Sequence, residues 1–492
     1  MSKQFATSIL VSRLFNAIVP ILSWLLITMP IWLSPFHPAV VAYFIIAFDL
    51  YFLYKALSTT YFATISYKSI LTHMKIPYFK KLAAQNGASE IKHFIIIPNF
   101  KEPLYKLEAT IYSLIKSDYS SKNIHLVLAF EKREPGVKTK ATFLEKKFRQ
   151  NFADLLITFH TLLPHETPGK ASNQTYAAKE VDSYVERNDW KRENILITIC
   201  DADSCLPKNY FSYLTYEYIR DKARVYHFYC APVLLYNNFR RLPFFIRMQA
   251  TLSSILRLAF LSQKDKLIQI STYSTSLWLL KKINFWDVDV IPEDWHIFYQ
   301  AFFTFGEKIQ TIPLYTIVNS DAVYSGGIIK TSGSRYEQEK RWAWGVSDIS
   351  YTLKKFFSTP HINLLAKLRR ILFLAETHLL WTTSFFILTI SASVPPLINP
   401  IFKRTVLGFL LPKLSGFILT LSSLMLILYV YLDYQLHKKL DQKIRLRSLP
   451  FLFIQWYLLP LVSFFFSSLP ALDAHTRLLF GKKIKYKVTE KV

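Results

Sequence analysis

Two aspartates separated by one residue are the first side chains in this sequence whose type and spacing suggest chemistry. Asp201 and Asp203 follow residues 195–200, a short apolar run with the β-branched content of a buried strand. Carboxylates at a strand end are hard oxygen ligands, suited to a Mg²⁺ or Mn²⁺ ion that also binds substrate phosphates. The alternative is an ordinary polar turn after the strand, so the pair needs support from other residues.

A second acidic pair, Glu293 and Asp294, follows Pro292 downstream. Asp294 lies in an aromatic stretch of sequence, and partial desolvation there would raise its pKa toward the range of a general base. The same residues also fit the first turn of a helix, where Pro, Glu and Asp are favoured. Both interpretations stay open, because a helix start can also present a catalytic acid.

Gln338, Arg341 and Trp342 form a third group, with spacing that puts the Gln on the same helix face as the other two. The Arg341 guanidinium can form a forked contact with a diphosphate leaving group. Trp342 can stack on the apolar face of a sugar. The alternative is an interfacial helix whose Trp and Arg side chains contact lipid headgroups.

Two weaker groups lie upstream. The first predicted strand of the middle region ends at Pro98, Asn99 and Glu102, where a loop can hold a nucleotide base and ribose. Lys170 and Asn173 stand at a predicted helix start, where a phosphate or ribose can be bound. Neither group is specific alone, because such residues are common in turns and at helix starts.

The elements that must position these residues alternate between strand and helix patterns. Predicted strands cover residues 93–98, 124–130, 155–162, 195–200 and 225–233, and predicted helices cover residues 104–116 and 171–186. This alternation favours a largely parallel sheet with helices on both faces. Ligands of such open sheets bind beyond the carboxyl ends of the strands, where the first aspartate pair is expected.

Long apolar segments flank this middle region. Residues 14–34 and 38–57 are each long enough to cross a bilayer, and residues 371–392 and 408–432 are further candidates. Residues 450–470 are apolar again, but a third C-terminal span would put the lysine-rich tail outside. We therefore expect a re-entrant segment there, or one span fewer. Residues 242–262 carry two arginines and fit an amphipathic helix at the membrane surface.

The predicted domain boundaries lie where long apolar segments give way to alternating strand and helix patterns. An N-terminal membrane region of two spans covers residues 1–60, and a cytosolic domain with interfacial helices covers residues 61–360. A C-terminal membrane region of two to three spans, or a re-entrant segment, covers residues 361–470, and a basic cytosolic tail covers residues 471–492. Lysines on the inner flanks of the spans predict a cytoplasmic catalytic domain.

The composition agrees with an integral membrane protein. The chain has 492 residues, of which 51% are hydrophobic, with a formal net charge of +26 and a pI near 9.7. No arginine-rich arm or recognition module points to nucleic acid, so the basic balance favours an anionic membrane or an anionic substrate. The three cysteines are odd in number and are typical of reduced thiols in a cytosolic domain.

Taken in order, these motifs resemble those of the membrane-embedded family-two glycosyltransferases, which include cellulose, hyaluronan, chitin and poly-N-acetylglucosamine synthases. Asp201-Ala202-Asp203 is similar to the family's Asp-x-Asp, and Gln338, Arg341 and Trp342 are similar to its Gln-x-x-Arg-Trp. The resemblance runs from about residue 14 to the tail.

Other segments match less closely. Pro292 replaces the Thr of the family's Thr-Glu-Asp motif, and Ser172 replaces Gly in a Lys-Ala-Gly-Asn segment. The tail residues Tyr486, Thr489 and Lys491 are similar to an aromatic-x-x-Thr-x-Lys ending.

The resemblance implies an α/β GT-A (Rossmann-like) cytosolic domain bracketed by transmembrane α-helices. It implies an inverting, metal-dependent transfer from a nucleotide-diphosphate sugar, expected to be a UDP-sugar, to a glycan or lipid acceptor. Glu131, at the end of the second strand, is the one acid left where the family usually has a pair that contacts uracil. The family's acceptor segment is replaced by residues 270–276, so acceptor and product are less constrained.

The resemblance also assigns roles to the motif residues. Asp203, with Asp201, would hold Mg²⁺ or Mn²⁺, and Asp294 would take the acceptor proton beside Glu293. Arg341 would face the diphosphate, while Gln338 and Trp342 would bind the acceptor. The nucleotide sugar would contact Pro98, Asn99, Glu102, Glu131, Lys170, Asn173 and Asp201.

The implied product is a polysaccharide, made by an integral protein of the plasma membrane. One alternative is a non-processive enzyme that adds a sugar to a lipid or protein, since the same fold serves many transfers. Another is a non-enzymatic transporter or scaffold, for which ionisable residues within the spans would be the signature. Asp49, Glu376 and His378 are candidates for such residues, although two of them lie near span ends.

Overall fold

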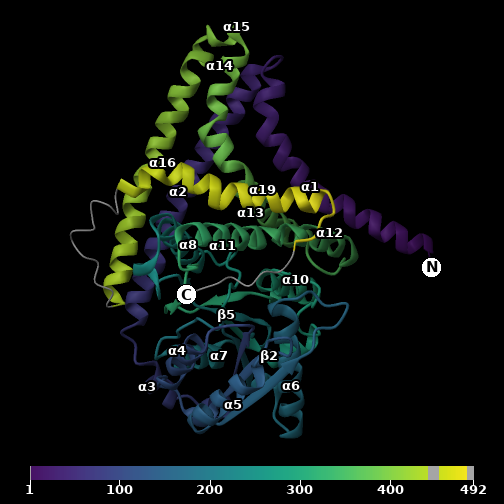
Figure 1. The fold of residues 1–492 in the computed structure, drawn as a ribbon, viewed down its shortest axis with the longest axis vertical. Coiled ribbons are helices and arrows are strands. Elements are labelled where there is room, and N and C mark those ends of the chain that lie inside the picture. The colour runs from purple at the N-terminus through teal and green to yellow at the C-terminus, as the bar shows by residue number, and fades with distance from the viewer. Residues whose placement is uncertain (1, 441–453, 485–492) are drawn as a thin grey trace.

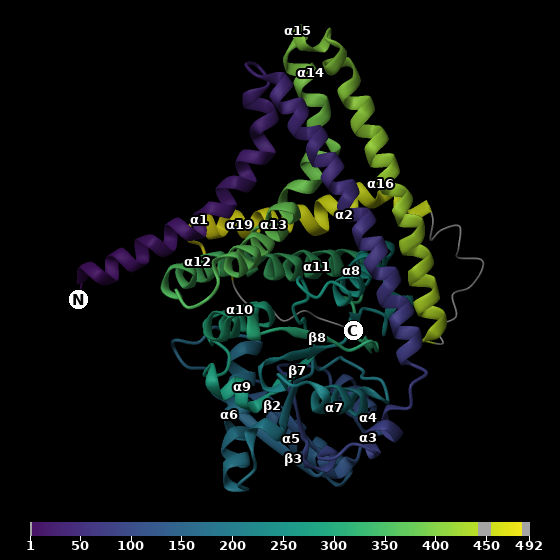
Figure 2. The same cartoon turned by 180° about the vertical axis from the view of Figure 1, so that it is seen from behind.

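The computed structural model describes residues 2–440 and 454–484. An α/β domain forms one end of the molecule, and a tapering group of long helices forms the other (Figures 1 and 2). Helices that run across the long axis lie between the two parts.

A seven-stranded mixed sheet forms the centre of the α/β domain. Its strand order is β3-β2-β1-β4-β7-β5-β8, and only β7 runs antiparallel to both of its neighbours. The strands are β1 (Lys92–Asn99), β2 (Ile124–Glu131), β3 (Asp154–His160), β4 (Ile195–Ile199), β5 (Phe228–Cys230), β7 (Tyr273–Ser276) and β8 (Thr311–Pro313). The four predicted strands up to residue 200 are therefore confirmed, and their order places the end of β4 near the middle of the sheet.

Both faces of the sheet are covered, as the continuous apolar runs predict. Along β1, Phe94 and Ile96 point into one hydrophobic core, whereas Ile95 and Ile97 point into another on the opposite face. Helix α6 (Lys170–Arg187) packs in the first core, and α4 (Leu104–Ile115), α5 (Val137–Phe148) and α7 (Tyr210–Arg220) pack in the second. The period-two alternation of a strand thus divides one apolar run between two cores.

The predicted strand at 225–233 is wrong as a single element. Residues Arg224–Tyr226 form a 3₁₀ turn, β5 follows it, and β6 (Val233–Leu234) pairs with β9 (Val318–Asn319) in a separate two-stranded sheet. Pro232 stands between β5 and β6 and has no N–H to donate to a ladder. Because β4 and β5 are both antiparallel to β7, β5 ends at the same edge of the sheet as β4, and β6 follows there.

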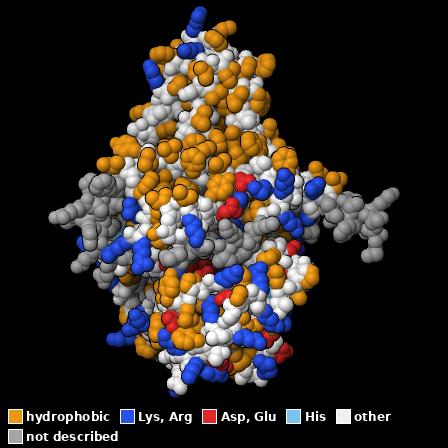
Figure 3. All heavy atoms as spheres, viewed as in Figure 1, with side chains coloured by type: hydrophobic (Ala, Val, Ile, Leu, Met, Phe, Trp, Pro, Cys, Tyr) orange, Lys and Arg blue, Asp and Glu red, His pale blue; other side chains and the backbone are white. Residues whose placement is uncertain are grey.

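Four long helices, α1, α2, α13 and α16, run along the long axis and form the tapering end (Figures 1 and 2). They are α1 (Ser2–Leu33), α2 (Pro38–His73), α13 (Leu364–Thr389) and α16 (Val406–Lys439). All four are long and apolar enough to cross a membrane. Figure 3 shows hydrophobic side chains over this end and most of the Lys and Arg side chains below it. The predicted pairs of spans at each end of the chain are present as helices.

Two further helical segments meet the same length and composition criteria, so the described residues hold six candidates. One is α8 (Phe244–Leu261), which is 61% buried over its most apolar window because it packs against α2 and α16. The other is Gln455–Leu479, which contains α18 (Leu459–Ser463), a π-helical turn at Phe464–Ser468 and α19 (Leu469–Leu479). In Figures 1 and 2, α19 runs across the long axis rather than along it. The expectation of a re-entrant segment at residues 450–470 stays a prediction, because α19 begins only at the end of that range.

The remaining helices connect these parts. They are α3 (Tyr78–Ala83), α9 (Leu277–Lys282), α10 (Glu293–Phe305), α11 (Ile328–Ala343), α12 (Asp348–Ser358), α14 (Val394–Ile398) and α15 (Pro400–Lys403). Helix α11 lies crosswise between the α/β domain and α19. The domain boundaries given above stay predictions. Residues 441–453 and the motif at Tyr486, Thr489 and Lys491 lie outside the described residues.

Candidate active site

A single lysine stands among three of the carboxylates that the sequence singles out. Lys170 is the first residue of α6, and its Nζ lies 2.7 Å from Asp201 Oδ1, 3.2 Å from Glu293 Oε1 and 3.7 Å from Asp294 Oδ1. Burial lowers its pKa, but the three carboxylates together hold that pKa well above its usual value. Three segments distant in sequence therefore meet at one edge of the sheet.

Ser271 joins two of these acids and was not predicted. Its backbone N–H donates to Asp294 Oδ2 at 2.7 Å, and its hydroxyl donates to Asp201 Oδ2. Ser271 has a φ of 68°, in the left-handed region that non-glycine residues rarely adopt. The turn before β7 thus holds an unfavourable backbone conformation at the point where it contacts both acids.

Asp203 is held by a different segment. Its Oδ2 accepts hydrogen bonds from Ser320 Oγ and from the Asp321 backbone N–H, both at 3.0 Å. Asp321 in turn pairs with Lys106 at 2.6 Å, and Asn237 donates to the Asp203 carbonyl at 3.0 Å. The second aspartate of the pair is therefore oriented by the segment that follows β9.

The donor chemistry around the aspartate pair fits a divalent ion that arrives with a substrate. Across residues 2–440 and 454–484, no group of three His, Cys, Asp or Glu side chains could hold a metal ion on its own. Mg²⁺ is commonly bound by one or two carboxylates, with water and substrate phosphates completing the shell. Asp201 and Asp203, at one strand end, supply a set of that kind.

Glu293 and Asp294 begin α10, directly after Pro292. Burial and the neighbouring Asp294 raise the pKa of Glu293 to about 7, although Lys170 acts in the opposite direction. Asp294 Oδ1 is buried and accepts no hydrogen bond from any described residue, because Lys170 Nζ is too distant for one. The two residues thus do lie at a helix start. Their surroundings differ, because Glu293 has a raised pKa and Asp294 Oδ1 accepts no hydrogen bond from a described residue.

The residues expected at the nucleotide lie at the neighbouring strand ends. Asn99 and Asn173 both donate to the Ala129 carbonyl, at 3.1 and 2.9 Å, so their amides hold the end of β2 in place. Pro98 is in register with that same Ala129. Asn173 Oδ1 remains buried and without a hydrogen-bond partner among the described residues, so it can still accept from a ligand.

The acids at this edge are paired with cations. Glu131 pairs with Arg133 after β2. Glu134, which the sequence analysis did not select, accepts from the Lys101 backbone N–H at 2.7 Å and from Lys140 Nζ at 2.8 Å. The same ammonium donates to the carbonyl of Glu102 at 2.7 Å. The loops after β1 and β2 are therefore joined through one lysine.

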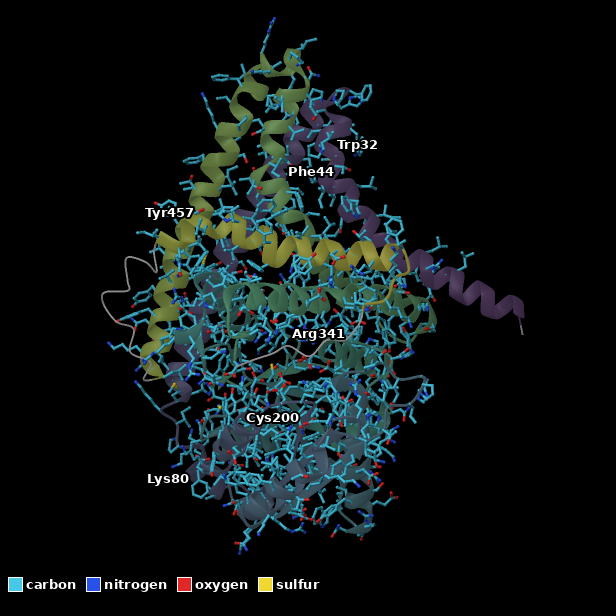
Figure 4. All side chains as sticks on the ribbon, in the orientation of Figure 1. Trp32, Phe44, Lys80, Cys200, Arg341 and Tyr457 are labelled. Carbon is cyan, nitrogen blue, oxygen red and sulfur yellow. The ribbon has the colours of Figure 1, made fainter. Side chains whose placement is uncertain are left out.

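Gln338, Arg341 and Trp342 lie on α11, between the apolar helices and the sheet. Figure 4 shows Arg341 on the side of the apolar helices relative to Cys200, which marks the end of β4. Gln338 Oε1 accepts from Arg335 Nη1 at 2.7 Å, and the Arg335 guanidinium lies 5.0 Å from the Trp342 ring centroid. The structure thus brings two of these three motif residues to one further arginine.

Arg257 of α8 connects this group to the acid cluster electrostatically. The charges of Asp201, after β4, and of Asp294, at the start of α10, act on it, as do those of Arg335 and Glu339 from α11.

Three residues of the site carry little signal in the sequence. Ser271 lies in a polar run that differs from the family pattern, but its backbone angle cannot be foreseen from sequence. Arg335 and Glu134 are single charges among many in a chain with 60 Lys and Arg residues and 34 Asp and Glu residues. The pairing of such charges depends on which elements meet, so the fold is needed to find them.

Comparison with known proteins decides the family. The model of glycosyl transferase family group 2 matches residues 196–466, more than half of the chain. This chain belongs to glycosyl transferase family group 2. The protein is therefore a glycosyltransferase, and the predicted GT-A domain flanked by apolar helices is confirmed. No protein of curated function matches the chain.

Solved structures show only distant likeness. A mannosyltransferase from Pyrobaculum calidifontis, in complex with GDP-Man and Mn²⁺, is 13% identical over 81% of this chain and 100% of its own, with a TM-score of 0.41. Residues 1–349 of TarS from S. aureus, in complex with UDP-GlcNAc, are 13% identical over 72% of this chain and 93% of their own, with a TM-score of 0.35. The family assignment rests on the sequence match.

Proposed function

We propose that this glycosyltransferase moves a sugar from a nucleotide-diphosphate sugar to a growing polysaccharide at the membrane, with inversion at the anomeric carbon. The observation that carries the proposal is the meeting of Asp201, Glu293 and Asp294 around Lys170 at the carboxyl edge of the sheet. In open α/β sheets this edge is where ligands bind. The expected metal-ligating and proton-accepting acids therefore share one site.

The donor would bind over the ends of β1, β2 and β4. Asn173 Oδ1 is available as a buried acceptor, and the Lys140 ammonium borders the same edge, where it pairs with Glu134. A UDP-sugar is the expected donor, and the acceptor is a glycan or lipid. The S. aureus structure holds UDP-GlcNAc and the Pyrobaculum structure holds GDP-Man, so both nucleotide types belong in the test.

Transfer breaks one bond and forms another. The acceptor hydroxyl oxygen forms a bond to the anomeric carbon, and the bond from that carbon to the diphosphate breaks, with its electron pair leaving on the diphosphate. The acceptor proton passes to Asp294, whose Oδ1 accepts no hydrogen bond from any described residue. Attack from the face opposite the leaving group inverts the configuration.

Charge on the leaving diphosphate must be balanced. Mg²⁺ or Mn²⁺, held by Asp201 and Asp203, would supply positive charge beside the diphosphate. Arg341 would contribute a forked contact to the diphosphate. The Lys170 ammonium offsets part of the mutual repulsion between Asp201 and Glu293, because it lies 2.7 Å from the first carboxylate and 3.2 Å from the second.

The position of α11 supports a polymeric product. Repeated addition requires the acceptor end to stay bound between cycles, and Trp342 beside Gln338 offers a surface of sugar size. Helix α11 lies between the acid cluster and the apolar helices, where a chain would leave the site toward the membrane. The free thiols Cys200, Cys205 and Cys230 agree with a catalytic domain on the cytoplasmic side of the plasma membrane.

The test uses the full chain in lipid nanodiscs with Mg²⁺ or Mn²⁺ and radiolabelled UDP-glucose, UDP-GlcNAc, UDP-glucuronate or GDP-mannose in turn. We expect nucleoside diphosphate release and high-molecular-weight labelled product from one donor. A single sugar on an extractable lipid would contradict processivity and favour the single-addition alternative. No nucleotide release from any donor would contradict the proposed function.

A further inference from the structure

Arg335 is a buried cation that no motif of the sequence selects. It lies on α11 and is 6% exposed, so its charge must be offset inside the protein. Its three donor groups each reach a different acceptor. Nε donates to Gln249 Oε1 at 2.7 Å, Nη1 donates to Gln338 Oε1 at 2.7 Å, and Nη2 donates to Glu339 Oε2 at 2.5 Å.

The partners of Arg335 tie together elements from distant parts of the chain. Gln249 belongs to α8 and donates its own amide to the Phe466 carbonyl at 2.7 Å. Phe466 lies in the π-helical turn at Phe464–Ser468, and such turns leave the backbone spacing altered. On the other side, Trp381 of α13 donates to Glu339 Oε1 at 3.0 Å. The guanidinium is thus fixed from α8, α11 and α13 at once.

The same guanidinium contacts both residues expected to bind the acceptor. Gln338 and Trp342 lie three and seven positions after Arg335, so all three share one face of α11. The guanidinium carbon is 5.0 Å from the centre of the Trp342 ring, within range of a cation–π contact. Gln338 uses its oxygen on Arg335, which leaves its NH₂ group as the part that can donate to an acceptor hydroxyl.

We infer that Arg335 is a positioning residue for the acceptor: by holding Gln338 and Trp342 in one orientation, it directs the transferred sugar to a glycan instead of water. The inference rests on the proposed function. Only an Arg side chain can donate to these three acceptors at once, because its planar guanidinium has donors in three fixed directions and a Lys ammonium does not.

The test compares Arg335→Lys with the wild-type protein, using whichever radiolabelled nucleotide sugar the wild type consumes. Arg335→Lys keeps the charge opposite Glu339 and so limits the cost to folding. Two quantities are measured together: nucleoside diphosphate released, and sugar incorporated into product. Water can replace the acceptor hydroxyl, so a site that binds donor but misplaces acceptor still releases nucleotide.

We expect sugar incorporated per nucleotide released to fall about tenfold or more in Arg335→Lys, with nucleotide release itself within about twofold of wild type. The product should also be shorter. A second variant, Arg335→Met with Glu339→Gln, removes the charge pair as a unit and should give the same change. Tyr336→Phe is the matched control on the same helix, because its hydroxyl contacts Asp473, and it should keep both quantities.

An unchanged ratio in Arg335→Lys would overturn the inference. A parallel loss of release and incorporation would also overturn it, since that pattern indicates general damage to the site. A wild-type protein that releases no nucleotide from any donor would instead contradict the proposed function, and with it this inference.

Discussion

At the scale of single residues, the aspartates of the site differ in what holds them. Asp201 is held by Lys170 and Ser271, whereas Asp203 is held by Ser320 and the Asp321 backbone N–H. The two acids therefore respond differently to substitution. Loss of the Asp201 charge would release Lys170 toward Glu293 and Asp294, whereas loss of the Asp203 charge would remove a proposed metal ligand without disturbing the lysine.

For this reason we expect Asp203→Asn to abolish metal-dependent nucleotide binding while the protein stays folded. The Asn carbonyl oxygen can still accept from Ser320 and Asp321, so the local hydrogen bonds persist. Binding of a fluorescent UDP or GDP analogue is measured with and without Mn²⁺. Asp154→Asn, at the start of β3, is the control that should bind normally. Equal metal-dependent affinity in Asp203→Asn would refute the metal assignment.

The sequence predicts the acids well and their surroundings poorly. Asp201, Glu293, Asp294 and Lys170 come from three motifs, and the structure brings all of them together. Each of these residues is common alone at a strand or helix end, so it was their order along the chain, and not their types, that singled them out. Ser271 was missed, since its role comes from a left-handed backbone angle and not from its side-chain type.

At the scale of elements, helix α10 carries the proposed base and is anchored two residues later. His296 is buried, with Asp348 of α12 at 2.8 Å from Nδ1 and Asp287 at 2.9 Å from Nε2. Burial lowers the pKa of His296, but Asp348 and Asp287 outweigh it and raise the pKa to about 10. The imidazolium therefore links α10 to α12, with the Tyr351 ring packed against it.

The ion pairs of His296 with Asp348 and Asp287 make the free energy of unfolding depend on pH in a defined direction. The folded pKa lies above the usual value of 6.5, so the contribution is full below about pH 6.5 and is lost as pH rises toward 10. We expect His296→Gln to lower the free energy of unfolding by about 3 kcal/mol at pH 6.5, because the buried Asp348 and the partly exposed Asp287 both lose their charged partner. Thermal scans from pH 6.5 to pH 10 should show the two proteins converging. If the melting temperatures of the two proteins changed in parallel with pH, the charged link between His296 and the two aspartates would be contradicted.

Element boundaries in the sheet were predictable as far as β4 and not beyond. Residues 93–130 and 155–200 alternate strand and helix with clear apolar periods, and the predicted strands form there. The stretch 225–233 looks like one strand, but Pro232 divides it between two sheets. Short strands paired through β7 depend on distant partners, which local sequence does not specify.

At the scale of the whole molecule, apolar composition alone could not distinguish helices that cross the membrane from helices that lie along its surface. Hydropathy identifies Gln455–Leu479 as a candidate span, yet α19 runs across the long axis while α1, α2, α13 and α16 run along it. The direction of α19 is set by its packing against α1 and α11, and a hydropathy profile carries no information about such packing. If these four helices cross the membrane, the start of α1 and the end of α16 lie on the same side of it.

We therefore predict a cytoplasmic C-terminus. A tag on residue 492 should be digested only after the cytoplasmic face is opened to protease, and a tag inserted between α15 and α16 should be digested from outside. Digestion of the C-terminal tag in intact cells would contradict this topology and indicate that Gln455–Leu479 crosses the membrane as a fifth span.

Asp294→Asn is the most direct test of the account, because Asp294 is proposed to act on the acceptor proton and not on donor binding. Donor affinity and sugar transfer are measured on the same purified preparation, with the nucleotide sugar that the wild type consumes. The account predicts affinity within about twofold of wild type and transfer slower by about 10²-fold or more. Transfer near the wild-type rate, or loss of donor affinity in step with transfer, would contradict it.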